Sequence, residues 1–217
     1  MRDRSAQLSG MSATVELRSD SESPKRQGVL DAAADLFMAL GYGAVSMDAI
    51  ARAAGVSKAT LYAYFSSKDQ LFATIIGEAC RQNMAGATSL PGGETDLRTA
   101  LIDFAGKLLR FLLEDRALAI HRVVMSESVR FPELGRAFYD NGPGQFRRLF
   151  GGWLTAQSEA GRLNVPDPIL AADQFIGLLR GGVYLRATLG LERPTEAEID
   201  AAVISAIAAF VRAYAPG

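Results

Sequence analysis

Residues 45–72 read VSMDAIARAAGVSKATLYAYFSSKDQLF, and this stretch decides the fold. Ser46 and Ser57 are residues typical of a helix N-cap, and Asp48 follows in a first turn, where the helix dipole favours a negative charge. Gly55 supplies a tight turn between the two short helices that these caps begin. The stretch therefore predicts a helix-turn-helix, two short helices that cross steeply on small or apolar inner faces.

The second short helix has a core side and an outward side. At 100° per residue from Lys58, Leu61 and Phe65 fall together on the core side. The outward residues are small, so the helix can enter a major groove, where alanine methyls can contact thymine methyls. Flanking hydroxyls and lysines can reach phosphates, which set register without reading sequence. The predicted DNA-binding residues are Ser46, Ser57, Lys58, Ala59, Thr60, Tyr62, Ala63, Tyr64 and Lys68.

These residues divide into phosphate contacts and base contacts. Tyr62, Tyr64 and Lys68 are expected to hold the DNA backbone, Lys68 together with the N–H groups of its helix start. Lys58 and Thr60 carry most of the polar base reading. Because the other two base-facing residues are alanines, we expect shape and thymine methyls to matter more than hydrogen bonds.

Stretch 45–72 resembles the DNA-binding segment of the TetR family of bacterial transcriptional regulators. The preceding helix begins at a Ser23–Pro24 cap and ends at Gly41, spaced as in that family. The resemblance covers residues 24–76 without a gap. It implies an all-α protein that binds double-stranded DNA at a palindromic operator.

Three positions depart from the family pattern. Ala63 stands where many relatives have histidine, Ala59 where glycine is common, and Ser66 at a usual proline position. The fold is unaffected, but one potential polar contact is lost, so direct base readout is expected to be thin.

Composition and charge exclude several classes of function. The chain has 217 residues, 49% of them hydrophobic and 22% charged, with a net charge of −1, which excludes a uniformly basic surface but allows a local patch. One cysteine and one histidine exclude an internal disulfide, a metal cluster and a two-histidine mechanism. With no nucleophile–base pair or phosphate loop in the sequence, we predict no catalytic residue, no metal, no cofactor and no enzyme. An all-helical enzyme is the remote alternative.

The chain divides into three predicted regions. Residues 1–22 are polar, without periodicity, and predict a flexible tail in which Met11 is an alternative start. They lack the apolar region of a secretory signal, and the chain has no apolar run near the roughly 18 residues of a membrane span, so a cytoplasmic protein with no membrane contact is expected. Residues 23–76 form the helix-turn-helix domain, and 77–217 a larger helical domain that binds ligand and dimerises. The whole chain predicts an all-α fold of roughly nine helices, with a boundary segment at 86–96.

The family resemblance implies that the larger domain binds a small molecule. The stretches FPELGRAFYDNGPGQFRRLF (131–150) and QFIGLLRGGVYLRATLG (174–190) also resemble an efflux- or stress-linked branch of the family, which names no ligand. Aromatic and apolar residues of the central helices predict a largely apolar ligand, although each could be plain core. The predicted lining residues are Phe104, Leu108, Phe111, His121, Met125, Phe146, Trp153 and Phe175.

Three polar or reactive residues in this domain have two interpretations. A lone histidine among apolar helices, His121, could bond a ligand or be satisfied by a backbone carbonyl. Cys80 is interpreted as a small buried hydrophobe rather than a redox sensor. Arg147 and Arg148 are interpreted as a solvated helix face.

The last two helices carry the predicted homodimer interface. Apolar stripes run along both, and the Gly181-Gly182 pair is expected where another helix approaches closely. Two such helices per subunit would pair as a four-helix bundle, and the alternative is that both complete the monomer core. The predicted interface residues are Phe175, Leu178, Gly181, Gly182, Leu185, Val203, Ile207, Phe210 and Tyr214.

The sequence therefore predicts a dimeric repressor that a small molecule releases from a palindromic operator. An activator or a ligand-independent regulator with the same DNA domain is the alternative, because the sign of control depends on where the operator lies.

Overall fold

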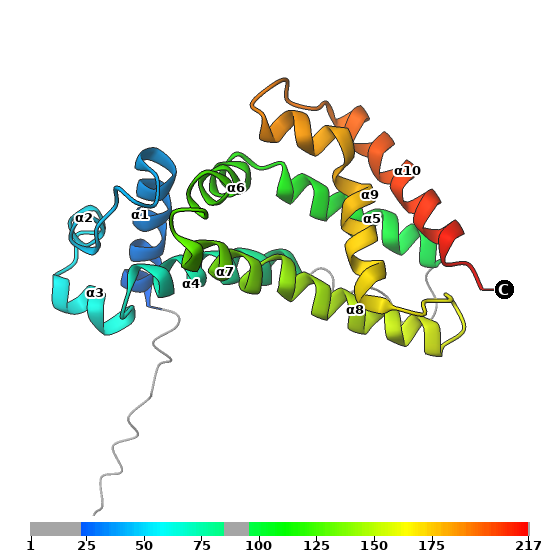
Figure 1. Ribbon diagram of the computed structural model, residues 1–217, viewed down its shortest axis with the longest axis horizontal. Helices are drawn as coiled ribbons and strands as arrows, with labels where there is room; N and C mark the ends of the chain where they lie inside the picture. Colours follow the sequence, from blue (N-terminus) through cyan, green and yellow to red (C-terminus); the bar gives the residue numbers. More distant parts are fainter. Residues whose placement is uncertain (1–22, 85–95, 217) are drawn as a thin grey trace, which may run out of the picture.

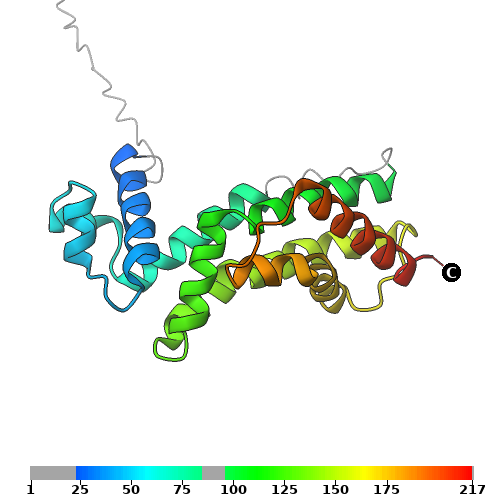
Figure 2. The same ribbon diagram turned by 90° about the horizontal axis from the view of Figure 1, so that it is seen from above.

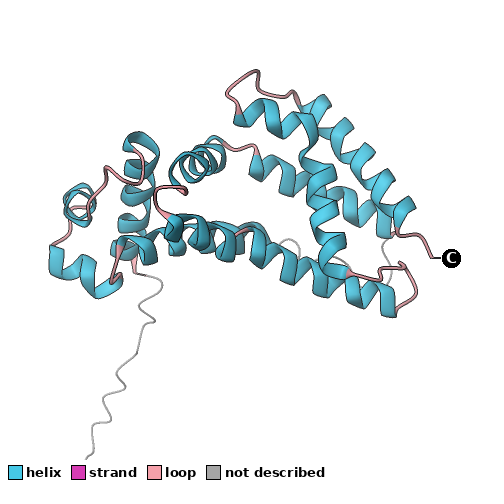
Figure 3. Cartoon of the chain, viewed as in Figure 1, coloured by secondary structure: helices cyan, strands magenta, loops and turns pink. Residues whose placement is uncertain are grey.

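The computed structural model describes residues 23–84 and 96–216, except for the side chains of residues 80–84, and over these ranges it contains helices and no strands (Figure 3). The predicted tail 1–22 with Met11, most of the boundary segment 86–96 and the side chain of Cys80 lie outside the described residues. The predicted all-α class is confirmed. The described helices are α1 (Pro24–Leu40), α2 (Met47–Ala53), α3 (Lys58–Tyr64), α4 (Lys68–Met84), α5 (Leu97–Leu112), α6 (Asp115–Glu127), α7 (Pro132–Asn141), α8 (Pro143–Glu159), α9 (Pro168–Thr188) and α10 (Glu196–Ala213).

Helices α7 and α8 each begin at a proline. Pro132 and Pro143 stand at the first positions of α7 and α8, where a missing N–H leaves no bond unmade. Gly142 ends α7 and immediately precedes α8. The prolines therefore begin two separate helices, and the described residues contain ten helices where the sequence predicts roughly nine. Within the described residues, no helix is long and apolar enough to cross a bilayer.

The helix-turn-helix lies at one end of an elongated molecule, with α1–α3 at the tip and α4 leading into the larger bundle of α5–α10 (Figures 1 and 2). Its core includes Phe37, Tyr42 and Phe72, and it also takes buried Val124 from α6 and Leu134 from α7. The tip and the bundle thus share one set of buried side chains. The predicted division after residue 76 stays a prediction, and it falls inside α4.

Five phenylalanines from four helices form the core of the bundle. The ring centroid of Phe150 lies 4.5 Å from that of Phe175 and 5.5 Å from that of Phe104, and Phe210 lies 5.2 Å from Phe175. Phe146 stacks on Phe150 at 5.3 Å. Because buried aromatic side chains dominate core energetics, this cluster joins α5, α8, α9 and α10 into one body.

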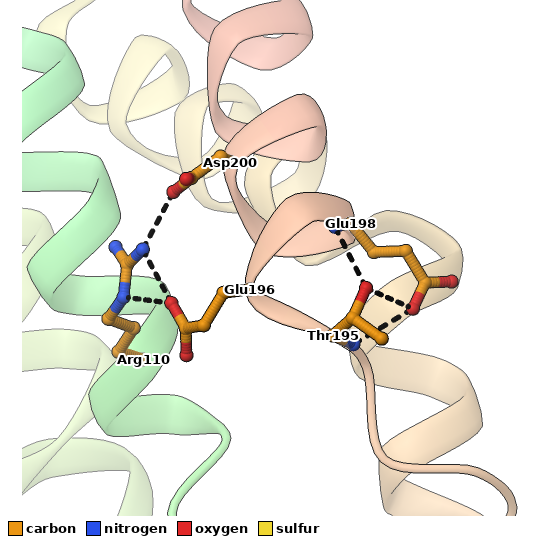
Figure 4. Close-up of polar contacts among 5 residues, drawn as sticks. All are labelled: Arg110, Thr195, Glu196, Glu198 and Asp200. Carbon is orange, nitrogen blue, oxygen red and sulfur yellow. Dashed lines mark hydrogen bonds and ion pairs between the residues drawn. The ribbon is translucent and has the colours of Figure 1, made fainter.

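Polar contacts fix the start of α10 (Figure 4). Thr195 and Glu198 form a capping box, in which the hydroxyl accepts from the Glu198 N–H and the carboxylate accepts from the Thr195 N–H. On the neighbouring α5, Arg110 reaches Glu196 at 2.8 Å and Asp200 at 2.6 Å. These groups are exposed, so they set the register of α10 more than they add to stability.

The first glycine of the Gly181-Gly182 pair interrupts α9, and the predicted approach of a partner helix at this pair stays a prediction. Gly181 has φ 41° and ψ −149°, which interrupts the helix at a conformation that side chains rarely adopt. A Cβ at Gly181 or Gly182 would meet nothing within 4 Å. Within the subunit, therefore, no close helix approach requires these glycines, and Gly181 is needed for its backbone angle.

Candidate nucleic-acid interface and internal cavity

The α2–α3 segment has the predicted helix-turn-helix geometry. Ser46 accepts a hydrogen bond from the Ala49 N–H at 3.2 Å, and Ser57 accepts one from the Thr60 N–H at 3.1 Å, so both predicted N-caps are confirmed. Gly55, at φ 65°, makes the turn between them. These local bonds fix where each short helix begins.

The face assignment of α3 is also confirmed. Leu61 and Phe65 are 0% and 2% exposed and hold the helix against the core. Ala59 and Ala63 are exposed on the outward side, where small residues let a helix approach a groove closely, and Thr60 is half-buried. The base-reading role of this side is an inference from that shape.

Two polar residues of α3, Lys58 and Thr60, already have partners within the protein. The Lys58 ammonium pairs with Asp48 of α2 at 2.5 Å, with both side chains largely exposed. The Thr60 hydroxyl lies 2.8 Å from that of Ser57. An exposed ion pair contributes about 0–1 kcal/mol, so Lys58 can exchange Asp48 for DNA at little cost.

The two tyrosines of α3 differ in freedom. Tyr62 is 51% exposed. Tyr64 is half-buried, and its hydroxyl lies 3.3 Å from the Ser23 hydroxyl at the start of α1. The phosphate contacts of both tyrosines stay predictions. Of the two side chains, Tyr62 is the more accessible to solvent.

Lys68 is bonded to the loop that precedes α2. Its ammonium donates to the carbonyl oxygens of Tyr42 at 2.8 Å and Val45 at 3.0 Å, and it lies 4.1 Å from the centre of the Tyr42 ring. Burial lowers the pKa of Lys68, against the opposing effect of nearby carboxylates led by Asp69. Lys68 therefore fastens the loop before α2 with two of its three donors, and its phosphate contact stays a prediction.

A cavity of about 330 Å³ lies between the tip and the bundle. Its walls come from α1, α4, α5, α6, α7, α8 and α9. This volume is within the range of about 300–1,000 Å³ typical of small-molecule sites. Four of the eight predicted lining residues line it, namely Leu108, Phe111, His121 and Phe146.

The other four predicted lining residues lie elsewhere. Phe104 and Phe175 are inside the aromatic core, 3% and 1% exposed. Trp153 stacks on Phe150 at 5.5 Å. Met125 is 65% exposed on the surface of α6. Periodicity correctly placed most of these on apolar faces, but it could not separate a cavity wall from a filled core.

Helices α1, α4 and α9 contribute walls of the cavity that the sequence did not predict. Leu30 lines the cavity from α1, Ile75 and Ile76 line it from α4, and Arg180 and Tyr184 line it from α9. Arg180 lies in the middle of an otherwise apolar helix, and because a charged residue there needs a polar environment, it could have indicated this site from the sequence.

Arg147 is also placed differently from its prediction. Its guanidinium lines the cavity, pairs with Asp173 of α9 at 2.8 Å and donates to the Tyr139 hydroxyl at 2.6 Å. It therefore joins α7, α8 and α9, whereas Arg148 is exposed, as interpreted from the sequence.

His121 is one of the titratable residues that line the cavity. Its ring lies 5.6 Å from that of Tyr184 and 5.9 Å from that of Phe138. Its Nδ1 is buried and has no hydrogen-bond partner among the described residues, so the backbone-carbonyl interpretation fails at that atom. Burial, and then the positive charges of Arg180 and Arg122, lower the pKa of His121, which is therefore neutral at pH 7.

Four predicted interface residues are core residues of the subunit. Phe175, Val203, Ile207 and Phe210 are each at most 2% exposed, packed in the cluster that joins α5, α9 and α10. Tyr214 is partly buried over Phe210 and donates to Gln174. For the four buried residues the alternative, a completed monomer core, is the correct one, and the interface role of Tyr214 stays a prediction.

Exposed apolar residues also lie on the same two helices, and Leu178 and Leu185 among them belong to the predicted interface, which stays a prediction. On α9, Leu178 is 45% exposed and Leu185 is 58% exposed. Leu189, which caps the C-terminal end of α9, is 64% exposed, and Ile204 of α10 is 50% exposed. Gly181 and Gly182 are exposed beside them. We call these six residues the α9–α10 face.

Two family models match the chain. Residues 29–75 match the model described as bacterial regulatory proteins, tetR family. Residues 99–216 match the model of the AefR-like transcriptional repressor C-terminal domain. Together these ranges contain the helix-turn-helix and most of the cavity and the whole α9–α10 face.

Individual relatives are regulators of both signs. The chain is 38% identical over 77 residues to the transcriptional activator FasR of Mycolicibacterium smegmatis, covering 36% of this chain and 35% of that protein. It is 37% identical over 84 residues to the transcriptional repressor KstR of Mycobacterium tuberculosis, covering 35% and 38%. The chain thus matches little more than a third of the length of these curated relatives. The solved structure of the flavonoid-responsive regulator FrrA is 41% identical, with a TM-score of 0.73 over 88% of this chain and 97% of that one.

Proposed function

The chain belongs to the TetR family of bacterial regulatory proteins, and from that premise we propose that it is a sequence-specific DNA-binding transcriptional regulator, a dimeric repressor that a small molecule releases from a palindromic operator. The relatives named above are regulators and not enzymes. They include an activator, so an activator with the same DNA domain is the second candidate. Since the operator is bacterial DNA, the proposal places the protein in the cytoplasm.

The observation that carries the proposal is the outward face of α3. Leu61 and Phe65 hold the helix from behind, so its small residues Ala59 and Ala63 stand exposed at the tip of the molecule. In a two-fold dimer, two such helices would enter successive major grooves about 34–36 Å apart. Each helix alone offers few polar base contacts, and the pair would supply the affinity.

Helix α6 supports a coupling between the cavity and DNA. Its inner turn carries Ile120 and His121 at the cavity. Its last residue, Glu127, accepts a hydrogen bond from the Gly43 N–H at 2.7 Å, in the loop that precedes α2. A ligand that prefers a shifted α6 would therefore shift this loop, and by linkage operator DNA would weaken ligand binding by the same factor.

The ligand proposed for the cavity is an aromatic small molecule. Phe111, Phe138 and Phe146 line it, and aromatic rings favour offset or edge-to-face contact with other rings. FrrA, the similar regulator, responds to flavonoids, which are planar aromatic compounds of this kind. Flavonoids are thus the first class to screen.

Operator binding tests the DNA-reading proposal. Duplexes selected from a random library are expected to be palindromic. The logarithm of the binding constant should fall linearly with the logarithm of the salt concentration, with a slope of about −0.9 for each phosphate that the protein neutralises. Thr60→Ala should change the preferred bases, whereas Tyr62→Phe should weaken all duplexes alike, because a phosphate contact carries no sequence information. Fluorescence anisotropy at several salt concentrations measures both effects. A flat salt response would exclude a DNA reader.

Glu127 tests the coupling. Glu127→Ala removes the acceptor of the Gly43 N–H, so the ratio of operator affinities without and with a saturating cavity ligand should fall towards 1, from a typical range of about 5–150. Glu127→Gln is the matched control, since its amide oxygen can still accept this bond. The ligand used is the flavonoid that raises the melting temperature of the wild-type protein most. Calorimetry checks that, without DNA, the variants bind this flavonoid as tightly as the wild-type protein does. Full coupling in Glu127→Ala would place the connection elsewhere.

A further inference from the structure

One end of the cavity carries a compact group of three polar side chains. His121 comes from α6, and Arg180 and Tyr184 come from α9. The guanidinium carbon of Arg180 lies 4.7 Å from the centre of the Tyr184 ring, and the His121 ring lies 5.6 Å from the same ring. Two helices thus bring a cation, an imidazole and a phenol to the same wall.

The charge of Arg180 is not neutralised by a neighbouring carboxylate. Two other arginines at the cavity have acidic partners, Arg147 with Asp173 at 2.8 Å and Arg116 with Asp31 at 3.3 Å. Arg180 makes no ion pair within the described part of the chain, and its Nε is buried there without a hydrogen-bond partner. A buried donor left unpaired costs about 1–3 kcal/mol, more when charged, so an acceptor at this place is favoured.

His121 is prepared for a hydroxyl or an oxyanion. Desolvation and the nearby charge of Arg180 keep the imidazole neutral by lowering its pKa. A neutral imidazole offers one donor and one acceptor, and the Nδ1 atom lacks a partner among the described groups. The atom can therefore bond to a ligand oxygen in either tautomer.

The rest of the lining is mostly apolar. Ile75, Ile76, Leu108 and Ile120 are all buried or nearly so, and the aromatic rings of α5, α7 and α8 complete the wall. A ligand that fits must bury an apolar body while it presents one polar head to the α6–α9 end. Such amphipathic matching, a hydrophobic pocket with a few placed polar groups, is how small-molecule sites obtain orientation and specificity.

We propose that His121, Arg180 and Tyr184 form the head-group site of the cavity and that the effector is an aromatic compound with an acidic oxygen, a carboxylate or a phenol. Arg180 binds the oxygen as the cationic donor, and His121 bonds the hydroxyl or the second oxygen. Tyr184 holds the guanidinium in place from below. This inference rests on the proposed ligand-binding function and names the chemistry of that site.

The test uses matched naphthalenes with the full-length protein. 2-Naphthoate is compared with methyl 2-naphthoate, and 2-naphthol with 2-methoxynaphthalene, by titration calorimetry at pH 7. In each pair the apolar body is the same, and only the head changes. We expect the acid, the phenol or both to bind at least about tenfold more tightly than the masked partner, the gain of one charge-assisted hydrogen bond. The pair with the larger ratio identifies the head as carboxylate or phenol.

Variants assign that preference to residues. Arg180→Met should remove the preference for 2-naphthoate while methyl 2-naphthoate binds within about twofold of its wild-type affinity, which also shows that the variant is folded. His121→Phe should remove the preference for 2-naphthol in the same way. Arg180→Lys should keep part of the acid preference, because the charge remains and the planar fork is lost. Arg148→Met is the control, the same loss of charge on α8 at a residue that lines no part of the cavity.

Three results would overturn the proposal: equal affinities within both pairs, a preference that survives both Arg180→Met and His121→Phe, or no binding by any of the four compounds. The proposed function fails by a different result. If a compound that saturates the cavity leaves operator affinity unchanged, ligand release of DNA is wrong, whatever head group the cavity prefers.

Discussion

Leu185→Asp is expected to give a folded monomer whose operator affinity is lower by about 100-fold or more. Leu185 is 58% exposed in the α9–α10 face, so a carboxylate there would be solvated in a lone subunit and buried in a dimer. Joining two DNA-binding units raises affinity by about 10²–10⁴-fold without any new contact, and this gain is lost with the dimer. Sedimentation equilibrium and anisotropy with the selected operator measure the two effects.

Two variants serve as controls for this result. Val129→Asp makes a similar apolar-to-acid change at a residue that is 91% exposed near the end of α6, and it should leave both the dimer and operator binding unchanged. Phe210→Asp places the charge at a residue that is 1% exposed, so it should unfold the subunit rather than separate a dimer. A Leu185→Asp protein that sediments as a dimer would move the interface off the α9–α10 face.

Phe175→Ala is expected to lower the free energy of unfolding by about 3–5 kcal/mol, the usual loss when a buried aromatic side chain is removed. Phe175 is 1% exposed and packs between Phe150 and Phe210. Urea unfolding can be followed by the fluorescence of Trp153, the single tryptophan, which stacks on Phe150. Protein concentration is held fixed, because dimerisation would add to the apparent stability.

Leu178→Ala is the matched control for Phe175→Ala. Leu178 lies three residues further along α9 and is 45% exposed. A monomer core at Phe175 and an interface at Leu178 therefore predict opposite outcomes: large destabilisation with the dimer retained for the first, and weaker dimerisation with little change in subunit stability for the second. If Phe175→Ala lost less than about 1 kcal/mol and weakened the dimer, Phe175 would return to the interface.

The sequence alone determined the fold class and the DNA-reading segment, because their signals act over a few residues. Ser46 and Ser57 bond to N–H groups three residues on, and Gly55 adopts its positive φ within one turn. Leu61 and Phe65 are four residues apart, which in any helix places them on one side. Such contacts are readable from spacing, and the structure has them where spacing predicted them.

The contacts of Lys68 could not be predicted from local spacing. Its carbonyl partners belong to Tyr42 and Val45, 26 and 23 residues earlier in the chain. A lysine in the first turn of a helix after a DNA-reading helix is typical of a phosphate contact. Only the packing of α4 against the loop before α2 turns its ammonium inward.

The last two helices show the same limit on a larger scale. Periodicity indicates that a helix has an apolar side, but it does not say whether the same chain or a second copy covers that side. In α10, the stripe with Val203 and Phe210 is covered by α5 and α9 of the same subunit, so the exposed face is the one through Ile204. The cavity was beyond the sequence for a related reason: its walls come from seven helices, and a void exists only where their side chains, once packed, fail to meet. Local bonding is written in neighbouring residues, whereas burial and empty space belong to the assembled helices, and only the tertiary structure decides them.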